Sequence, residues 1–172
     1  MQSRRPQPLD KGVLENLVGR LFPDVKNWLE EAGEVFSDDL GQDLFDELVD
    51  LLEKTYTAND VRCGWDGYVL ARELEERGWS PDGELVAILH DAEALAYSSL
   101  REEVVRWVAM NGLVPSHKVG EPIRVHTHTN EPDLMGQVAI VHPETMEYTV
   151  LLPTGSYMEI PHEKVRHGRD GG

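Results

Sequence analysis

The apolar residues of this 172-residue chain follow two different periods, and the change near Pro115 constrains the fold most strongly. Before Pro115 they recur every three or four residues, as at Val13, Leu17 and Leu21, which is the spacing of a helix with one buried face. After it, apolar and β-branched residues alternate in short runs, which is typical of strands. The sequence therefore predicts an α+β protein with an all-α helical domain over 1–114 and a small antiparallel β domain over 115–172.

Proline and capping signals divide the first part into five or six helices. Pro23 interrupts the first apolar run, so two short helices are expected, at about 9–21 and 23–35. Ser37 is a good N-cap candidate for a third helix, at about 38–55, because Asp38 and Asp39 follow it at the positive end of the helix dipole.

The rest of the helical part carries two further start signals. Asp66 is expected to cap a helix that stops at Gly78. Ser80 is the next N-cap candidate, with Pro81 at the first helical position. The apolar run that follows predicts either one long helix or two helices broken near Ser98 and Ser99.

The last third of the chain contains strand-like segments separated by turn residues. They read "PIRVHTHT", "GQVAIVHP", "EYTVLLPTG" and "SYMEIP", and four or five such strands should close into a small barrel. The segments "VGEPIRVH", "GQVAIVHPETMEYTVLLPTG" and "EIPHEKV" resemble a Src-homology-three-type (SH3-like) barrel of the Tudor or KOW kind. The resemblance lies in the order of the Gly-led first strand, Gly-x-Val, Tyr-x-Val and Ile-Pro-x-x-x-Val. It implies the fold only, because this architecture supports many functions.

Charge narrows the partners that the chain can bind. It has 16 basic and 32 acidic residues, a net charge of −16, and residues 1–114 hold 11 of the basic and 24 of the acidic ones. Such a balance disfavours direct binding to nucleic acid or to anionic membranes and favours a basic protein partner. A single cysteine, Cys63, excludes an intramolecular disulfide and a cysteine-based zinc site. Together with the lack of an apolar leader or span, it predicts a cytoplasmic protein.

Residues 27–53 carry ten Asp and Glu and no Lys or Arg. At about 100° per residue the apolar side chains of the third helix share one arc, which is expected to be buried: Leu40, Leu44, Phe45, Leu48, Leu51 and Leu52. The acidic side chains share the opposite arc: Asp39, Asp43, Asp46, Glu47, Asp50 and Glu53. This acidic face is predicted to dock on a basic partner surface, and the alternative is that it only makes the protein soluble. A specific version is a nucleic-acid mimic that inhibits a DNA- or RNA-binding enzyme, as small phage inhibitors do.

Four tryptophans lie in the helical part. Trp28 and Trp107 occupy apolar helical positions and are expected in the core. Trp65 and Trp79 adjoin glycines and turn signals, so they are candidates either for exposed partner anchors or for the core.

Two alternatives to a non-enzymatic interaction protein stay open. His126 and His128 alternate along a predicted strand and could chelate a divalent metal in an enzyme, or simply face water. The candidates for a third metal ligand are Glu131, Asp133, His142 and His162. No other cofactor is expected, and Cys63 has no accompanying nucleophile signature.

The other alternative is a nucleic-acid-binding adaptor built on the barrel. It depends on the fold resemblance and on a basic cluster near the end of the chain: Lys164, Arg166, His167 and Arg169. Tyr148 and Tyr157 are too few aromatic residues for a methyl-lysine cage.

Overall fold

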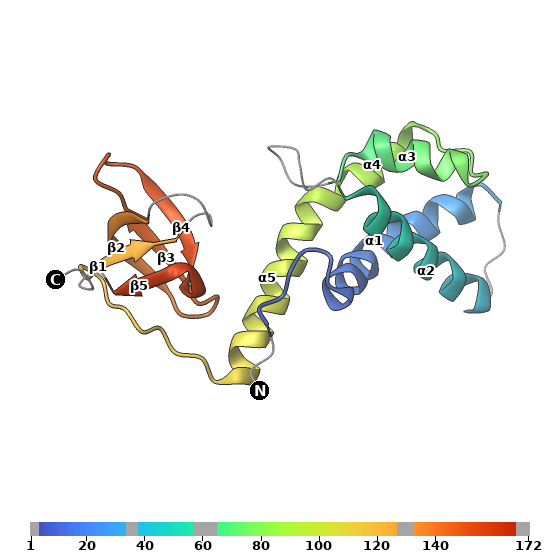
Figure 1. Cartoon of the computed structure of the whole chain (residues 1–172). Coiled ribbons are helices and arrows are strands. Elements are labelled where there is room, and N and C mark those ends of the chain that lie inside the picture. Colours follow the sequence, from blue (N-terminus) through green and yellow to red (C-terminus); the bar gives the residue numbers. More distant parts are fainter. Residues whose placement is uncertain (1–3, 34–37, 57–64, 127–132, 168–172) are drawn as a thin grey trace. The chain divides into compact units, whose positions relative to one another are not determined.

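The structure of the chain is a computed structural model that describes residues 4–33, 38–56, 65–126 and 133–167. Helices precede an antiparallel sheet, so the predicted α+β class is confirmed (Figure 1). The backbone divides into two compact units, Arg4–Glu103 and a second that begins at Val104. The dividing point lies within helix α5 (Ala92–Asn111), and the domain boundary expected near residue 114 stays a prediction.

The first helix, α1 (Lys11–Glu31), is continuous through Pro23, so the prediction of two short helices was wrong. Leu17, Leu21 and Val25 are buried, and their four-residue spacing runs across the proline without a break. Pro23 lies on the exposed side, where the Gly19 carbonyl that loses its N–H partner can bond to water. Burial of one uninterrupted face therefore outweighs the local cost of the proline.

The third predicted helix, which carries most of the acidic segment, is α2 (Asp38–Thr55), with the predicted bounds. Leu44, Leu48, Leu51 and Leu52 are buried, as expected, and Phe45 is half-buried. Leu40 is an exception, because it is 44% exposed in the first turn of the helix. The Ser37 cap lies outside the described residues.

The next helix, α3 (Gly67–Glu76), begins where Asp66 predicted it. The Asp66 carboxylate accepts hydrogen bonds from the backbone N–H groups of Tyr68 and Val69. The helix ends before Gly78, whose φ of +95° is a conformation that favours glycine.

Asp82, not Ser80, caps the following helix, α4 (Gly83–His90). Its Oδ1 accepts from the N–H groups of Glu84 and Leu85, both at 3.0 Å, which satisfies two donors of the first turn. A carboxylate directly after the Ser-Pro pair is therefore the cap, and the helix begins two residues later than expected.

The break between α4 and α5 lies at Asp91, so both expectations for this segment were wrong. The helix continues through Ser98 and Ser99. The Ser98 hydroxyl donates to the Leu95 carbonyl three residues back, which satisfies it within the helix, and Ser99 is fully buried.

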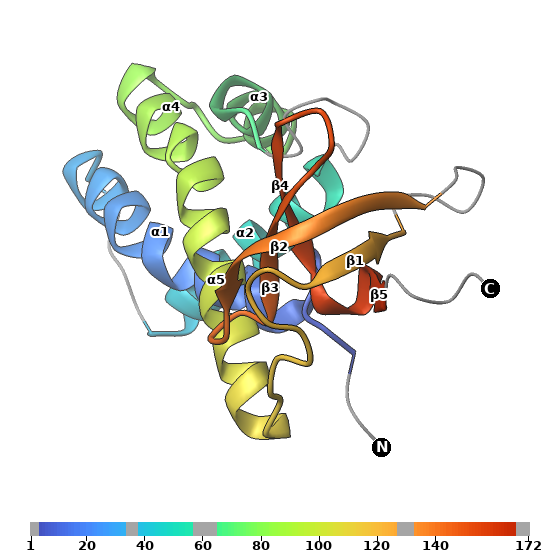
Figure 2. The ribbon, with the colours of Figure 1, turned by 90° about the vertical axis from the view of Figure 1, so that its left-hand side faces the viewer.

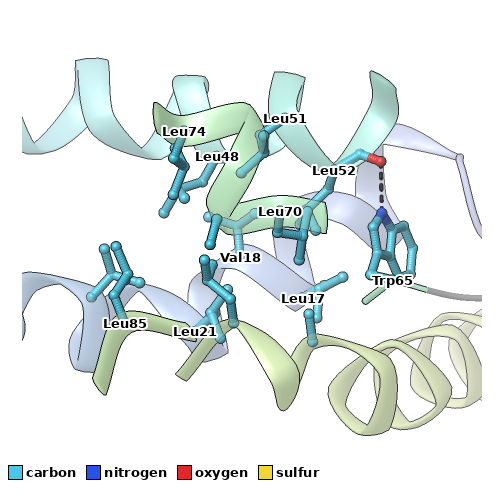
Figure 3. Packing of buried hydrophobic residues seen from close by; sticks show 14 of the residues in the cluster. Leu17, Val18, Leu21, Leu48, Leu51, Leu52, Trp65, Leu70, Leu74 and Leu85 are labelled. Carbon is cyan, nitrogen blue, oxygen red and sulfur yellow. Dashed lines mark hydrogen bonds between the residues drawn. The ribbon is translucent and has the colours of Figure 1, made fainter. Parts of the chain in front are cut away.

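The core of the helical unit forms where α1 packs against α2 and α4, and α3 against both α2 and α4. It is built mainly of leucines and includes Trp65, which is only 3% exposed (Figure 3). The indole Nε1 of Trp65 donates to the Leu52 carbonyl at 2.7 Å, so its one polar group is satisfied inside the core.

The second unit contains a curled antiparallel sheet of five strands, which confirms the predicted antiparallel β character of the chain after residue 115 (Figure 2). The strands are β1 (Pro122–Val125), β2 (Leu134–His142), β3 (Glu147–Leu151), β4 (Tyr157–Pro161) and β5 (Val165–His167). Their order is β4-β3-β2-β1-β5, so β4 and β5 form the edges of a half-barrel. A short 3₁₀ turn, His162–Lys164, joins β4 to β5.

Alternate residues of these strands form a second small core. Its buried members are Ile123, Val125, Val138, Tyr148, Val150 and Ile160. The Tyr148 hydroxyl accepts from the backbone N–H groups of Ser116 and His117, which ties the segment before β1 to the centre of the sheet.

Candidate functional site

The acidic face of α2 is divided into exposed and internally bonded carboxylates. Asp43, Asp46 and Glu53 are exposed, whereas Glu47 and Asp50 are half-buried. Asp39 lies in α2, but its side chain is outside the described part. Of the predicted contact set, the structure therefore leaves three carboxylates exposed to solvent on one helix.

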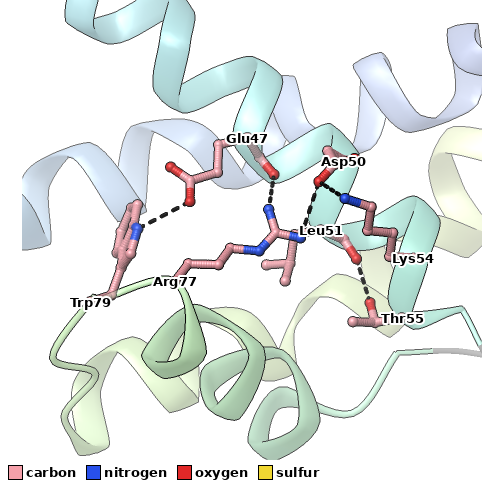
Figure 4. Close-up of polar contacts among 7 residues, drawn as sticks. All are labelled: Glu47, Asp50, Leu51, Lys54, Thr55, Arg77 and Trp79. Atoms are coloured by element: carbon pink, nitrogen blue, oxygen red, sulfur yellow. Dashed lines mark hydrogen bonds and ion pairs between the residues drawn. The ribbon is translucent and has the colours of Figure 1, made fainter.

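Arg77, at the end of α3, contacts both half-buried residues, Glu47 and Asp50 (Figure 4). Its Nη2 lies 3.1 Å from the Asp50 carboxylate, and its Nη1 is 3.5 Å from the Glu47 carbonyl. Lys54 also donates to Asp50, at 2.8 Å. The Lys54 ammonium, assisted by Arg77, lowers the pKa of the Asp50 carboxyl below its ordinary value. Asp50 thus serves the contact between α2 and α3.

Trp79 connects this acidic face to a pair of stacked indoles. Its Nε1 donates to Glu47 Oε1 at 3.2 Å (Figure 4). Its ring lies parallel to that of Trp28, with an interplanar angle of 7° and centroids 6.4 Å apart. Trp28 in turn donates through Nε1 to Asp82 Oδ1 at 3.0 Å. Each indole is therefore oriented by a carboxylate on a different helical element.

The two tryptophans line an open pocket of about 570 Å³ between the end of α1 and the start of α4. Its lining is Trp28, Leu29, Glu31, Ala32, Gly78, Trp79, Ser80, Asp82 and Glu84. Three of these are carboxylates and, among the described residues, no lysine or arginine lines the pocket. A volume of about 300–1,000 Å³ with apolar walls and a few polar groups is typical of small-ligand sites.

The geometry at Asp82 makes a prediction about pH. The Leu85 N–H bond, and then the Trp28 indole, hold the pKa of the Asp82 carboxyl below its ordinary 3.8. The cap and the Trp28 bond thus contribute their full stabilisation above pH 3.8 and lose it as the pH falls through the lowered folded-state pKa. In a nuclear magnetic resonance titration, the Trp28 indole N–H signal should change with a midpoint below 3.8.

Asp82→Asn is the matched control, because asparagine still caps the helix but does not titrate. The acid transition of Trp28 should disappear in this variant. The Trp65 indole signal serves as the reference for global unfolding. A Trp28 midpoint at or above 3.8, or a transition that persists in the variant, contradicts the prediction.

The tryptophans that are buried in the structure are not the ones that the sequence predicts to be buried. Trp65, a candidate anchor, is a core residue, whereas Trp79 is half-buried beside the pocket. Trp28, expected in the core, is half-buried and lines the same pocket. Trp28 lies three residues after Val25, a spacing that places it on the buried face of α1. The helix ends three residues after Trp28, however, and the spacing of residues along one helix does not show whether another helix covers that end.

The histidines of the second unit do not form a cluster in the described part. His126 Nδ1 lies 2.9 Å from Asp133 Oδ1, and His142 Nε2 lies 2.9 Å from Thr149 Oγ1. His162 contacts Glu163 and the ring of Trp107. Within the described residues no three His, Cys, Asp or Glu are arranged to hold a metal ion. His128, Glu131 and Cys63 lie outside these residues, so the metal pair stays a prediction.

Among the described residues, the surface of the curled sheet carries few groups that suit a nucleic acid or a methyl-lysine. Tyr148 is 1% exposed and Tyr157 is 66% exposed, so one of these two tyrosines is at the surface. Lys164 and Arg166 are exposed, His167 ends β5, and Arg169 lies outside the described residues.

In the described part of the chain, no helix combines the length and the apolar character needed to cross a membrane.

No known protein family matches the chain, and no curated protein is similar to it. Its function is therefore inferred from its own surface chemistry.

Proposed function

We propose that this is a non-enzymatic interaction protein whose acidic helical unit docks on a basic surface of a protein partner. The observation that supports it is the exposure of Asp43, Asp46 and Glu53 along α2, in a unit whose sequence is strongly acidic. Complementary charge across an interface speeds association and suppresses wrong partners. Asp39 belongs to the proposed contact set by its position in α2.

A protein that itself binds DNA or RNA is the proposed type of partner. Carboxylates on successive helical turns present negative charge to a surface that normally receives phosphates, so the protein would act as a nucleic-acid mimic and inhibitor. We further propose that the curled sheet is a Tudor- or KOW-like barrel, and that the protein works in the cytoplasm.

Neutralising the exposed carboxylates tests this function. The variant Asp43→Asn, Asp46→Asn, Glu53→Gln should keep its helical circular dichroism and bind the partner at least tenfold more weakly, roughly 1.4 kcal/mol. The partner is first captured from a lysate of the source cells at low salt and identified. Its dissociation constant is then measured by calorimetry with wild-type and variant protein.

The control variant carries the same change of charge elsewhere on the helical unit: Asp24→Asn, Glu75→Gln, Glu76→Gln. All three residues are exposed, on α1 and α3. Binding should weaken much less than in the α2 variant. If the α2 variant and the wild type bind the partner with equal affinity, the docking role is rejected. If the α2 variant and the control variant lose affinity equally, the binding depends on net charge alone and not on the α2 face.

A further inference from the structure

The pocket is lined by two indole side chains, Trp28 and Trp79, and by three carboxylates. Glu31, Asp82 and Glu84 are exposed at its lining, at the end of α1 and the start of α4. Arg77, which precedes Gly78 of the lining in sequence, is engaged by Glu47 and Asp50 of α2 and does not line the pocket. The lining thus repels anions and attracts a cation, since no lysine or arginine is among the described residues that line it.

The orientation of the aromatic walls is fixed by polar contacts. Trp28 is held by Asp82 and Trp79 by Glu47, so the two indoles are kept parallel. A cation close to an indole face is attracted by the ring quadrupole, and a planar guanidinium can also stack on it. Asp82 takes its three hydrogen bonds, from Trp28, Glu84 and Leu85, through Oδ1, and none of them uses Oδ2.

Carboxylates beside a flat aromatic wall suit arginine better than lysine. The guanidinium presents a rigid fork of donors that matches a carboxylate, whereas the ammonium of lysine is a strongly hydrated point charge. We infer that this pocket binds an arginine side chain presented by the basic partner, stacked on the indoles of Trp28 and Trp79 and bonded to the carboxylates of Glu31, Asp82 and Glu84.

The inference rests on the proposed function and adds an anchor to it. Glu47 belongs to the acidic face of α2, and its carboxylate accepts from the indole of Trp79, so one hydrogen bond links this face to a residue of the pocket lining. A basic partner segment could place an arginine in the pocket while its other charges face Asp43 and Asp46. The pocket would then supply selectivity that charge alone does not give.

A short peptide tests the pocket without the partner. The capped peptide glycine–arginine–glycine is titrated into the full-length protein, and the four indole N–H signals are followed by nuclear magnetic resonance. The signals of Trp28 and Trp79 should shift and saturate, while those of Trp65, in the core, and Trp107 stay in place. The matching lysine peptide should bind more weakly and the glutamate peptide should not bind.

Paired variants separate the pocket from net charge. Glu31→Gln, Glu84→Gln should weaken arginine-peptide binding by at least about fivefold, because two of the three carboxylates lose their charge. The control Glu75→Gln, Glu76→Gln changes the net charge equally on the exposed surface of α3 and should stay within about twofold of the wild type. Unshifted Trp28 and Trp79 signals, equal binding of the lysine peptide, or equal losses in both variants would overturn the inference.

The α2 variant distinguishes the two proposals. It should retain the arginine-peptide shift at Trp28 and Trp79 even though it loses affinity for the whole partner. A protein that binds its partner through Asp43, Asp46 and Glu53 but gives no shift with the peptide keeps the proposed function and loses the pocket. A protein that gives the shift but binds no basic partner keeps the pocket and loses the proposed function.

Discussion

Replacing Leu48 with alanine is expected to lower the free energy of unfolding of the helical unit by about 2–5 kcal/mol. Leu48 is fully buried at the centre of α2 and belongs to the core that α1, α2, α3 and α4 share. The truncation removes apolar atoms and leaves a cavity that packed neighbouring helices cannot fully close. Urea unfolding of the full chain, followed by circular dichroism at the helical band, measures the loss.

Leu40→Ala is the matched control, because it makes the same chemical change on the same helix. Leu40 is 44% exposed, so the change should cost less than about 1 kcal/mol. Similar losses in the two variants would contradict the difference in burial between Leu48 and Leu40 that the structure shows.

Replacing Gly67 with alanine is expected to destabilise the same unit by about 1–3 kcal/mol through overpacking. An added Cβ would lie 2.7 Å from the Val86 carbonyl oxygen and 2.8 Å from the His90 backbone nitrogen. Both atoms are backbone atoms of α4, so α3 and α4 would have to move apart rather than one side chain rotate. Chemical denaturation measures the change, and amide hydrogen exchange should show the weakest protection in α3 and α4.

Gly19→Ala tests whether the cause is the close approach rather than loss of a glycine. Gly19 lies on the exposed side of α1, and an added Cβ there would meet no atom within 4 Å. Alanine should therefore stabilise the helix, by about 0.5–1 kcal/mol, because it removes the entropic penalty of glycine. Destabilisation at Gly19, or none at Gly67, contradicts the packing described here.

The helix caps show which features can be predicted from a few neighbouring residues and which cannot. Asp66 was recognised as a cap because its side chain reaches donors two and three residues on, which is a purely local interaction. Ser80 followed by Pro81 gave an equally clear local signal, yet Asp82 caps α4. Asp82 also accepts from Trp28 on α1, and this contact between distant segments favours the later start.

The tryptophans show the same limit for the candidate site. Local spacing placed Trp28 in the core and left Trp65 undecided, whereas the structure buries Trp65 and sets Trp28 beside a pocket. Whether an aromatic side chain is covered depends on which helix packs over it and where that helix ends. Neither quantity is a property of the residue's own segment.

The α+β class, the change from helices to strands and the separation of acidic from apolar residues along α2 could be predicted from the sequence alone. These follow from period, composition and capping, which act within a few residues. Tertiary packing sets the course of α1 through Pro23, the bonds of Trp79 to Glu47 and of Arg77 to Asp50, and the position of Trp28 and Trp79 beside a common pocket. The reason is that these outcomes depend on burial and on polar partners far away in the chain, which exist only once the helices have packed.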